Sequence, residues 1–209
     1  MAVATVVDVR RAVDAAWAAR PEHDVSWPDP HPDRDPLTEE YSRVTDPERY
    51  AVVGARAQSW IDALVALGLA DASVVEDGAT RLVPRAPDAL PLTVVVRALD
   101  GVPGGVVDLL VGDPAASVDV QPDCGCDACD SGSADLLEAI DDAFVGVLGG
   151  GFVLIESERS RIVATADGWS ATGATGGVDA AIAAARRGER RPDRRTLVGG
   201  SWWAPVMTR

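Results

Sequence analysis

The spacing of apolar residues changes part-way along the chain, and this change most constrains the fold. In residues 5–19 and again in 50–67, apolar side chains recur every three or four positions, which predicts two amphipathic helices. The middle of the chain instead carries short Val- and Leu-rich runs separated by Pro, Gly and Asp, which predict strands. These runs cover residues 80–84, 92–98, 106–111 and 116–121. Helical spacing returns after residue 133, followed by a predicted hairpin over 152–156 and 161–166 and a short helix from Val178.

This order of elements predicts the fold class. Helices, then strands, then a mixture of both indicate an α+β fold in a single domain, with helices packed on an antiparallel or mixed sheet. Residues 21–36 break the pattern with five prolines, both histidines and Trp27, which predicts an irregular arm. We therefore expect an N-terminal helix and Pro-rich arm over residues 1–36. A single α+β domain containing the cysteines is expected over 37–209.

Helix boundaries carry their own signals. The segment Thr45-Asp46-Pro47-Glu48 has the form of a capping box with proline early in the helix, so a helix is expected to begin there. Ser133 or Asp135 can cap the helix that follows the cysteines. In that helix, Asp141 and Asp142 are expected on the face that contacts solvent.

Composition excludes several classes of function. The chain has 209 residues and no lysine, so it has neither a P-loop lysine nor a Schiff-base lysine. The net charge of −14 disfavours nucleic acid as a partner. No apolar run approaches the roughly 20 residues of a membrane helix, and no secretory signal is visible at the N-terminus. The sequence thus predicts a cytoplasmic protein whose partner is another protein or a small molecule, without nucleic acid or membrane.

All three cysteines lie within six residues, in the segment Asp123-Cys124-Gly125-Cys126-Asp127-Ala128-Cys129-Asp130. Thiolates at Cys-x-Cys-x2-Cys spacing can reach one ion from a single loop, and Zn²⁺ favours such ligands. Cys124, Cys126 and Cys129 are therefore the candidate metal ligands, with zinc the expected metal. A fourth ligand is missing from the motif, and the candidates are a water molecule or one of Asp123, Asp127, Asp130, His23 and His31.

The cysteines also allow other roles. They can be small buried residues that shape a strand-to-helix loop, or Cys126 and Cys129 can form a redox pair. An iron–sulfur cluster usually needs four thiolates and is disfavoured. From Asp100 to Glu158 the chain has thirteen acidic residues and no basic one, a charge field expected to attract a cation and to raise thiol pKa values.

Two further segments contain residues that could bind a ligand. The glycine-rich run from Gly168 to Gly177 can hold an anion before a helix, but it matches neither a P-loop nor a dinucleotide motif, so a connecting loop is favoured. The run from Arg186 to Arg195 contains six arginines and can bind an acidic partner or nucleic acid. A solvated loop after a helix, or a loop folded onto the acidic half of the chain, is favoured. No cofactor-binding motif and no catalytic residue follow from these segments.

Several blocks together resemble a family of actinobacterial proteins known only as a domain of unknown function. The blocks are Glu40–Tyr50, Arg81–Pro87, Val111–Pro114, Gly168–Ser170, Gly200–Trp202 and, most distinctively, Asp123–Ser133 with the sequence DCGCDACDSGS. The resemblance covers roughly residues 37–203 and implies a soluble bacterial domain with the cysteine loop as a family trait; no activity or ligand comes with it. We expect an interaction or regulatory module with a metal-binding or structural cysteine loop. The alternative is an enzyme, redox or hydrolytic, that uses the loop and nearby carboxylates.

Overall fold

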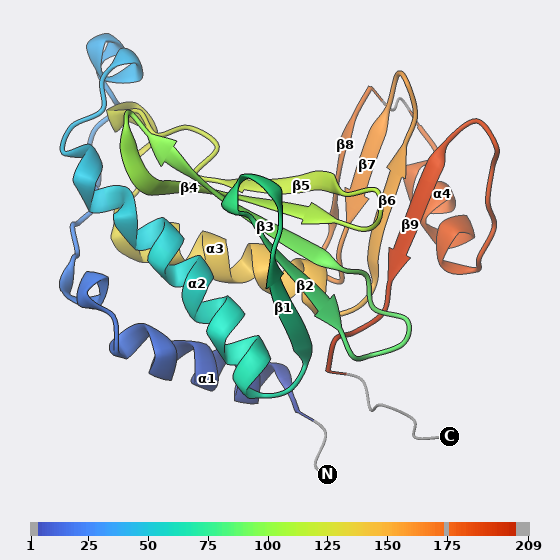
Figure 1. Ribbon diagram of the computed structural model, residues 1–209. Coiled ribbons are helices and arrows are strands. Elements are labelled where there is room, and N and C mark those ends of the chain that lie inside the picture. Colours follow the sequence, from blue (N-terminus) through green and yellow to red (C-terminus); the bar gives the residue numbers. More distant parts are fainter. Residues whose placement is uncertain (1–3, 174–175, 204–209) are drawn as a thin grey trace.

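Two antiparallel sheets and the helices packed on them form the fold (Figure 1). The computed structural model describes residues 4–173 and 176–203. The helices are α1 (Val6–Ala18), α2 (Ala51–Ala66), α3 (Ser133–Leu148) and α4 (Val178–Arg186). The first sheet has the order β1 (Ala70–Val74), β2 (Thr80–Pro84), β3 (Leu92–Leu99), β4 (Val102–Val111) and β5 (Ala116–Gln121). The second has the order β8 (Trp169–Thr172), β7 (Arg161–Ala164), β6 (Phe152–Glu156) and β9 (Arg195–Gly199).

The main core lies between the first sheet and the helices α1, α2 and α3, which lie on one side of it in Figure 1. Trp60 of α2 and Phe144 of α3 are fully buried, with their rings stacked 5.0 Å apart between centroids. Large aromatic side chains dominate such cores because each removes a large apolar area from water. The α1 helix adds Val9, Val13 and Trp17, spaced at four residues as its sequence predicts.

The second sheet has a smaller core of its own and is joined to the main core through β6. Val153 and Ile155 of β6 pack with Val178 and Ile182 of α4 in the smaller core. Successive residues of a strand point to opposite faces, and the alternate residue Leu154 belongs to the main core. One strand thus contributes to both cores, and the molecule is a single compact α+β domain, as the sequence predicted.

A buried ion pair connects α2 to α3, and it corrects one expectation. Asp141 was expected to face solvent, but it is 8% exposed and accepts hydrogen bonds from Arg56 Nε at 2.8 Å and Trp60 Nε1 at 2.7 Å. Arg56 also donates to Asp14 of α1 at 2.9 Å. A buried carboxylate needs such partners, and because residues 100–158 contain no basic side chain, the arginine had to come from another part of the chain.

The predicted strands and helices are confirmed, while three strands were not predicted. Strand β1 buries one residue in five, and β8 has three exposed residues in four, so neither shows the apolar alternation that marks a strand. Strand β9 begins at Arg195, the last arginine of the charged run, and all of its residues except the buried Gly199 are half-buried.

Both predicted helix caps are wrong. The predicted helix start is confirmed, because a 3₁₀ helix over Pro47–Tyr50 with proline in its first turn leads directly into α2, but Thr45 makes no capping hydrogen bond there. Gly132 is the N-cap residue of α3, and neither Ser133 nor Asp135 caps it. Thr45 and Ser133 instead contact distant residues, described below.

In the described part of the chain, the helices are too short or too polar to cross a membrane. The division at residue 36 stays a prediction, although α1 packs directly against α2.

Candidate metal centre

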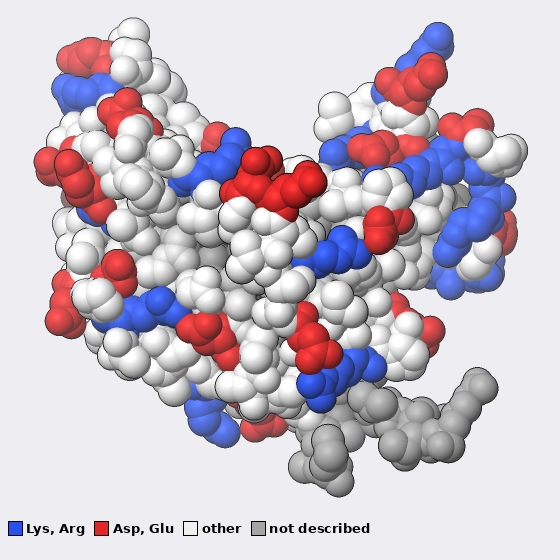
Figure 2. All heavy atoms as spheres, viewed as in Figure 1, with Lys and Arg blue, Asp and Glu red and all other residues white. Residues whose placement is uncertain are grey.

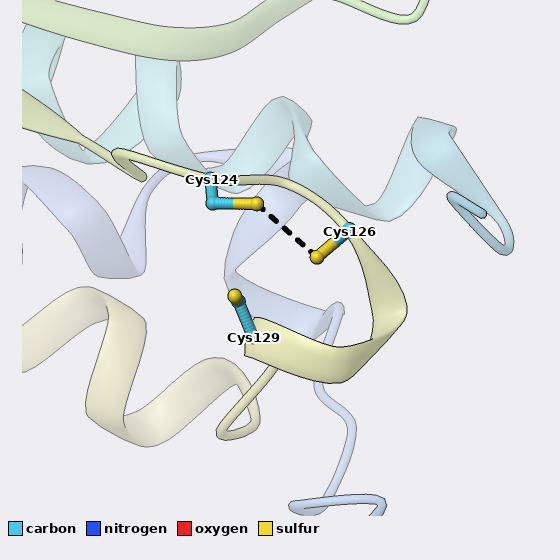
Figure 3. A group of neighbouring side chains, drawn as sticks. All are labelled: Cys124, Cys126 and Cys129. Carbon is cyan, nitrogen blue, oxygen red and sulfur yellow. Dashed lines mark hydrogen bonds between the residues drawn. The ribbon is translucent and has the colours of Figure 1, made fainter. Parts of the chain in front are cut away.

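The three cysteines lie in the loop between β5 and α3, and their sulfur atoms face one another (Figure 3). All three Sγ atoms are within 4.8 Å of one another. The Cys124 thiol donates a hydrogen bond to Cys126 Sγ at 3.1 Å. Cys126 is buried, whereas Cys124 and Cys129 are exposed. Three sulfur atoms at these separations lie close enough to hold one metal ion.

A short turn brings the sulfurs together. Residues Asp127–Cys129 form a 3₁₀ turn in which the Cys129 amide donates to the Cys126 carbonyl at 3.0 Å. Gly125 lies against Leu99, and a Cβ atom at Gly125 would come within 2.5 Å of Leu99 Cδ1. The glycine therefore allows the loop to approach the end of β3 closely.

Asp127 fastens one side of the loop to the segment before α2. Its carboxylate accepts hydrogen bonds from the Thr45 amide and the Thr45 hydroxyl, both at 2.6 Å, and from Arg43 Nε. The Asp127 amide in turn donates to the Arg43 carbonyl at 2.7 Å. Burial alone would raise the pKa of Asp127, but the hydrogen bonds from Arg43 and Thr45 outweigh it and lower the pKa. This carboxylate is consequently held as an anion within the protein.

Asp130 and Ser133 fasten the other side of the loop to the Pro-rich arm. Asp130 accepts hydrogen bonds from Trp27 Nε1 at 2.9 Å, from the Gly132 amide at 2.9 Å and from Arg49. The Ser133 hydroxyl accepts from the Trp27 amide and donates to its carbonyl, each at 3.1 Å. The Arg49 guanidinium also lies over the Trp27 ring, 4.8 Å from its centroid. We call these contacts of Asp127, Asp130 and Ser133 the arm clasp.

The arm clasp engages two of the residues predicted as a fourth ligand, Asp127 and Asp130. Asp127 and Asp130 bind arginines, so neither carboxylate turns towards the sulfurs. His31 contacts Glu40 at 3.3 Å and His23 lies beside Asp24 at 3.3 Å. Among the described residues, the group that could hold an ion contains the three cysteines alone.

The negative charge field around the cysteine loop is also weaker than the sequence predicted. Arginines outside residues 100–158 pair with the acids around the loop, so the local field is smaller than the sequence suggests. These pairs are Arg43–Asp127, Arg49–Asp130, Arg56–Asp141 and Arg10–Asp142.

The pKa values of Cys126 and Cys129 are shifted in opposite directions. Burial raises the pKa of Cys126, but hydrogen bonds from Cys124, Cys129 and backbone amides outweigh this and lower it, contrary to the expectation. Hydrogen bonds to Cys126 and Cys124, with burial, raise the pKa of Cys129 to about 12. One thiolate shared among three sulfurs is the arrangement these shifts favour.

The other two candidate segments come together on the second sheet. The glycine-rich run contains β8 and ends at Gly177, the left-handed N-cap residue of α4; residues 174 and 175 lie outside the described part. Arg190, Arg191 and Arg194 of the arginine-rich run line a groove with Gly176 and Gly177. The two segments lie before and after α4 in the sequence, so the sequence alone did not indicate that they share one groove.

The residues of the arm clasp outside the loop were not predicted from the sequence; they are Trp27, Arg43, Thr45 and Arg49. One signal was available. Residues 100–158 contain no basic side chain, so any buried acid there had to find its partner in another part of the chain.

A family model described as a family of unknown function, DUF6226, matches residues 13–208. The match starts before the Pro-rich arm, which the resemblance noted from the sequence had left out. No curated protein and no solved structure matches the chain.

Proposed function

Because the chain belongs to DUF6226, a family of unknown function, we propose its role from the cysteine loop itself. Cys124, Cys126 and Cys129 bind one zinc ion, and the metal-bound loop keeps the N-terminal arm in place. In this proposal the protein is a cytoplasmic interaction or regulatory module, of actinobacterial origin as the resemblance implies. The main support for the proposal is that the three Sγ atoms lie within 4.8 Å of one another, in a loop whose flanking carboxylates already pair with arginines.

The sulfur positions are close to those zinc requires. Zinc–sulfur bonds of about 2.3 Å at tetrahedral angles separate the sulfurs by about 3.8 Å. The loop holds its sulfurs within 4.8 Å of one another, with one pair at 3.1 Å, so side-chain rotations suffice to reach that geometry. A thiol-only ligand set favours zinc among common divalent ions, since magnesium and calcium prefer oxygen.

The fourth position supports an interaction role. Cys124 and Cys129 are exposed, so an ion bound between them faces solvent on one side. A water molecule or a side chain of a partner can complete the coordination there. Binding of a partner would then depend on the metal, which is the property of a regulatory contact.

The arm clasp supports a link between metal and arm. Cys129 directly precedes Asp130, whose carboxylate binds Trp27 and Arg49. An ion that fixes the cysteine turn thereby fixes the residue that holds the arm. Zinc binding adds to folding stability because the unfolded chain lacks the preformed site.

Elemental analysis of the purified full chain tests the proposal. We expect one zinc per chain, lost in each of the variants Cys124→Ser, Cys126→Ser and Cys129→Ser. Ser131→Ala, an exposed change in the same loop, is the matched control and should keep the metal. Protein without metal, together with unchanged melting of the three cysteine variants, would reject the zinc site.

The second candidate function is an enzyme, redox or metal-assisted, and the exposure of Cys124 and Cys129 favours it. An enzyme needs a thiol or an open metal position that a substrate can reach. Titration of the folded protein with a thiol reagent separates the zinc site from an enzyme that uses a free thiol. A structural zinc site protects all three thiols until unfolding, whereas an enzymatic thiol reacts rapidly in the folded state.

A further inference from the structure

The groove beside α4 joins the two segments that the cysteine loop does not use. It has a volume of about 670 Å³ and is lined by Gly176 and Gly177 at one end of α4 and by Arg190, Arg191 and Arg194 beyond the other. We propose that this groove binds a small molecule that carries two or more phosphate groups. The inference is independent of the zinc site, because the two lie at opposite ends of the molecule in Figure 1.

The shape of the groove suits an elongated small molecule. Its floor is the face of α4 that carries Ala180, Ala181 and Ala184, and its wall includes Ile155 of β6 and Thr196 of β9. The helix has nine residues and is therefore about 13.5 Å long. Ligand pockets of a few hundred cubic ångströms with apolar walls and a few polar groups are typical of small-molecule sites.

The groove is positive in a strongly acidic protein. Figure 2 shows arginines gathered over α4 and the loop before β9, against a net charge of −14 for the chain. Glu189 also lines the groove, but it pairs with Arg187 at 2.8 Å. Arg191 forms no ion pair within the described residues, and Arg194 pairs only with the exposed Asp193 at 3.2 Å.

One arginine atom lacks an acceptor. The Arg194 Nε atom is buried and has no hydrogen-bond partner among the described residues. An unsatisfied buried donor costs free energy, and a rotation of the Arg194 side chain that turns Nε towards the groove would let an anion there accept a hydrogen bond from it. Arg190 is held by two hydrogen bonds from Nη1, to the Ala185 carbonyl at 3.0 Å and to the Glu189 carbonyl at 3.2 Å.

The donor chemistry favours phosphate. A guanidinium group presents paired N–H donors that match phosphate oxygens, and several arginines match several phosphate charges. At the other end of the groove, the backbone amides that open α4 add a weaker attraction for an anion. A neutral ligand would leave the arginine charges without a counterion.

Calorimetric titration of the full chain with ATP, inorganic pyrophosphate and adenosine tests this inference. We expect saturable binding of ATP and pyrophosphate at one site per chain, and no binding of adenosine, which lacks phosphate. Arg191→Ala and the double change Arg191→Ala with Arg194→Ala should weaken binding by about tenfold or more. Ala184→Glu, which blocks the floor with a carboxylate and leaves the arginines in place, should abolish it.

Arg159→Ala is the matched control, because Arg159 is an exposed arginine of the neighbouring β6–β7 hairpin. This variant removes the same charge and should bind as the wild type does. Circular dichroism melting confirms that each variant is folded. Absence of saturable ATP and pyrophosphate binding would overturn the proposal, and so would an equal loss in Arg159→Ala and Arg191→Ala. Zinc content stays unchanged in all these variants, so failure here is distinguishable from failure of the metal site.

Discussion

The cysteine loop and the arginine-rich loop are both conspicuous charged segments in the sequence, yet they occupy opposite environments in the fold. In the cysteine loop, Asp127 and Asp130 are buried, and each pairs with an arginine more than 80 positions earlier in the chain. In the arginine-rich loop, Arg190 and Arg191 are exposed and line an open groove. A charged run whose partners come from far away acts as internal structure. The arginine-rich loop instead keeps Arg191 without an ion pair among the described residues and satisfies Arg190 and Arg194 through near neighbours in sequence, so this side of the groove is available for a ligand.

The largest expected effect comes from removing a buried acid of the arm clasp. Asp130→Ala leaves Arg49 and the Trp27 ring nitrogen without their acceptor and should lower the free energy of unfolding by about 3 kcal/mol. Asp193→Ala, which removes an exposed carboxylate of the arginine-rich loop, should leave it nearly unchanged. Urea denaturation measures both. Equal losses in the two variants would remove the contrast between the loops.

A substitution at Gly132, which strains the backbone of the arm clasp, is expected to lower the free energy of unfolding slightly less. Gly132 has φ +91°, and a Cβ atom there would come within 2.6 Å of the Asp29 amide nitrogen. Gly132→Ala should therefore cost about 2–3 kcal/mol from strain and crowding. Gly168→Ala is the control, because its Cβ would meet nothing within 4 Å. Thermal melting of both variants provides the comparison, and a stable Gly132→Ala would show that the arm is loosely held.

Metal removal should act on the cysteine loop alone. With free zinc at about one hundred times its dissociation constant, binding stabilises the fold by about 2.7 kcal/mol, which a chelator would remove. The loss should be the same in Arg191→Ala, because the groove lies elsewhere. Melting with and without chelator checks this. A chelator effect that disappears in Arg191→Ala would mean that the two regions are not independent.

The smallest expected effect is a pH dependence in the arm. The Arg34 guanidinium and the Leu37 amide bind Glu40 and lower its pKa from 4.5 to about 2, with His31 also adjacent. Since the folded pKa lies below the unfolded value, this carboxylate contributes stability above about pH 4.5, and the contribution is lost as pH falls towards 2. The difference in unfolding free energy between wild type and Glu40→Gln should shrink over that window. A difference independent of pH would contradict the assigned cause.

The spacing of apolar residues was sufficient to predict the helices and strands that bury an apolar face. The helices α1 to α4 and the strands β2 to β7 follow directly from it. Strands β1 and β8 were missed because their side chains are mostly exposed, so pairing with a neighbouring strand, and not burial, holds them in place.

The grouping of the cysteines was predictable, but their surroundings were not. Three thiols within six residues must lie near one another, whatever the fold. Thr45 and Ser133 looked like local helix caps, because local hydrogen bonds are the usual role of such residues before a helix. Their actual partners, Asp127 and Trp27, are 82 and 106 positions away in sequence. A contact of that range depends on the whole fold and leaves no local pattern.

We propose that one zinc ion is bound by the three cysteine thiolates. X-ray absorption at the zinc edge, on the purified full chain, counts the sulfur neighbours of the metal directly. We expect three sulfur atoms at about 2.3 Å and one lighter oxygen or nitrogen neighbour. A zinc shell of oxygen and nitrogen alone, or a chain that takes up no zinc when the metal is supplied, would contradict it.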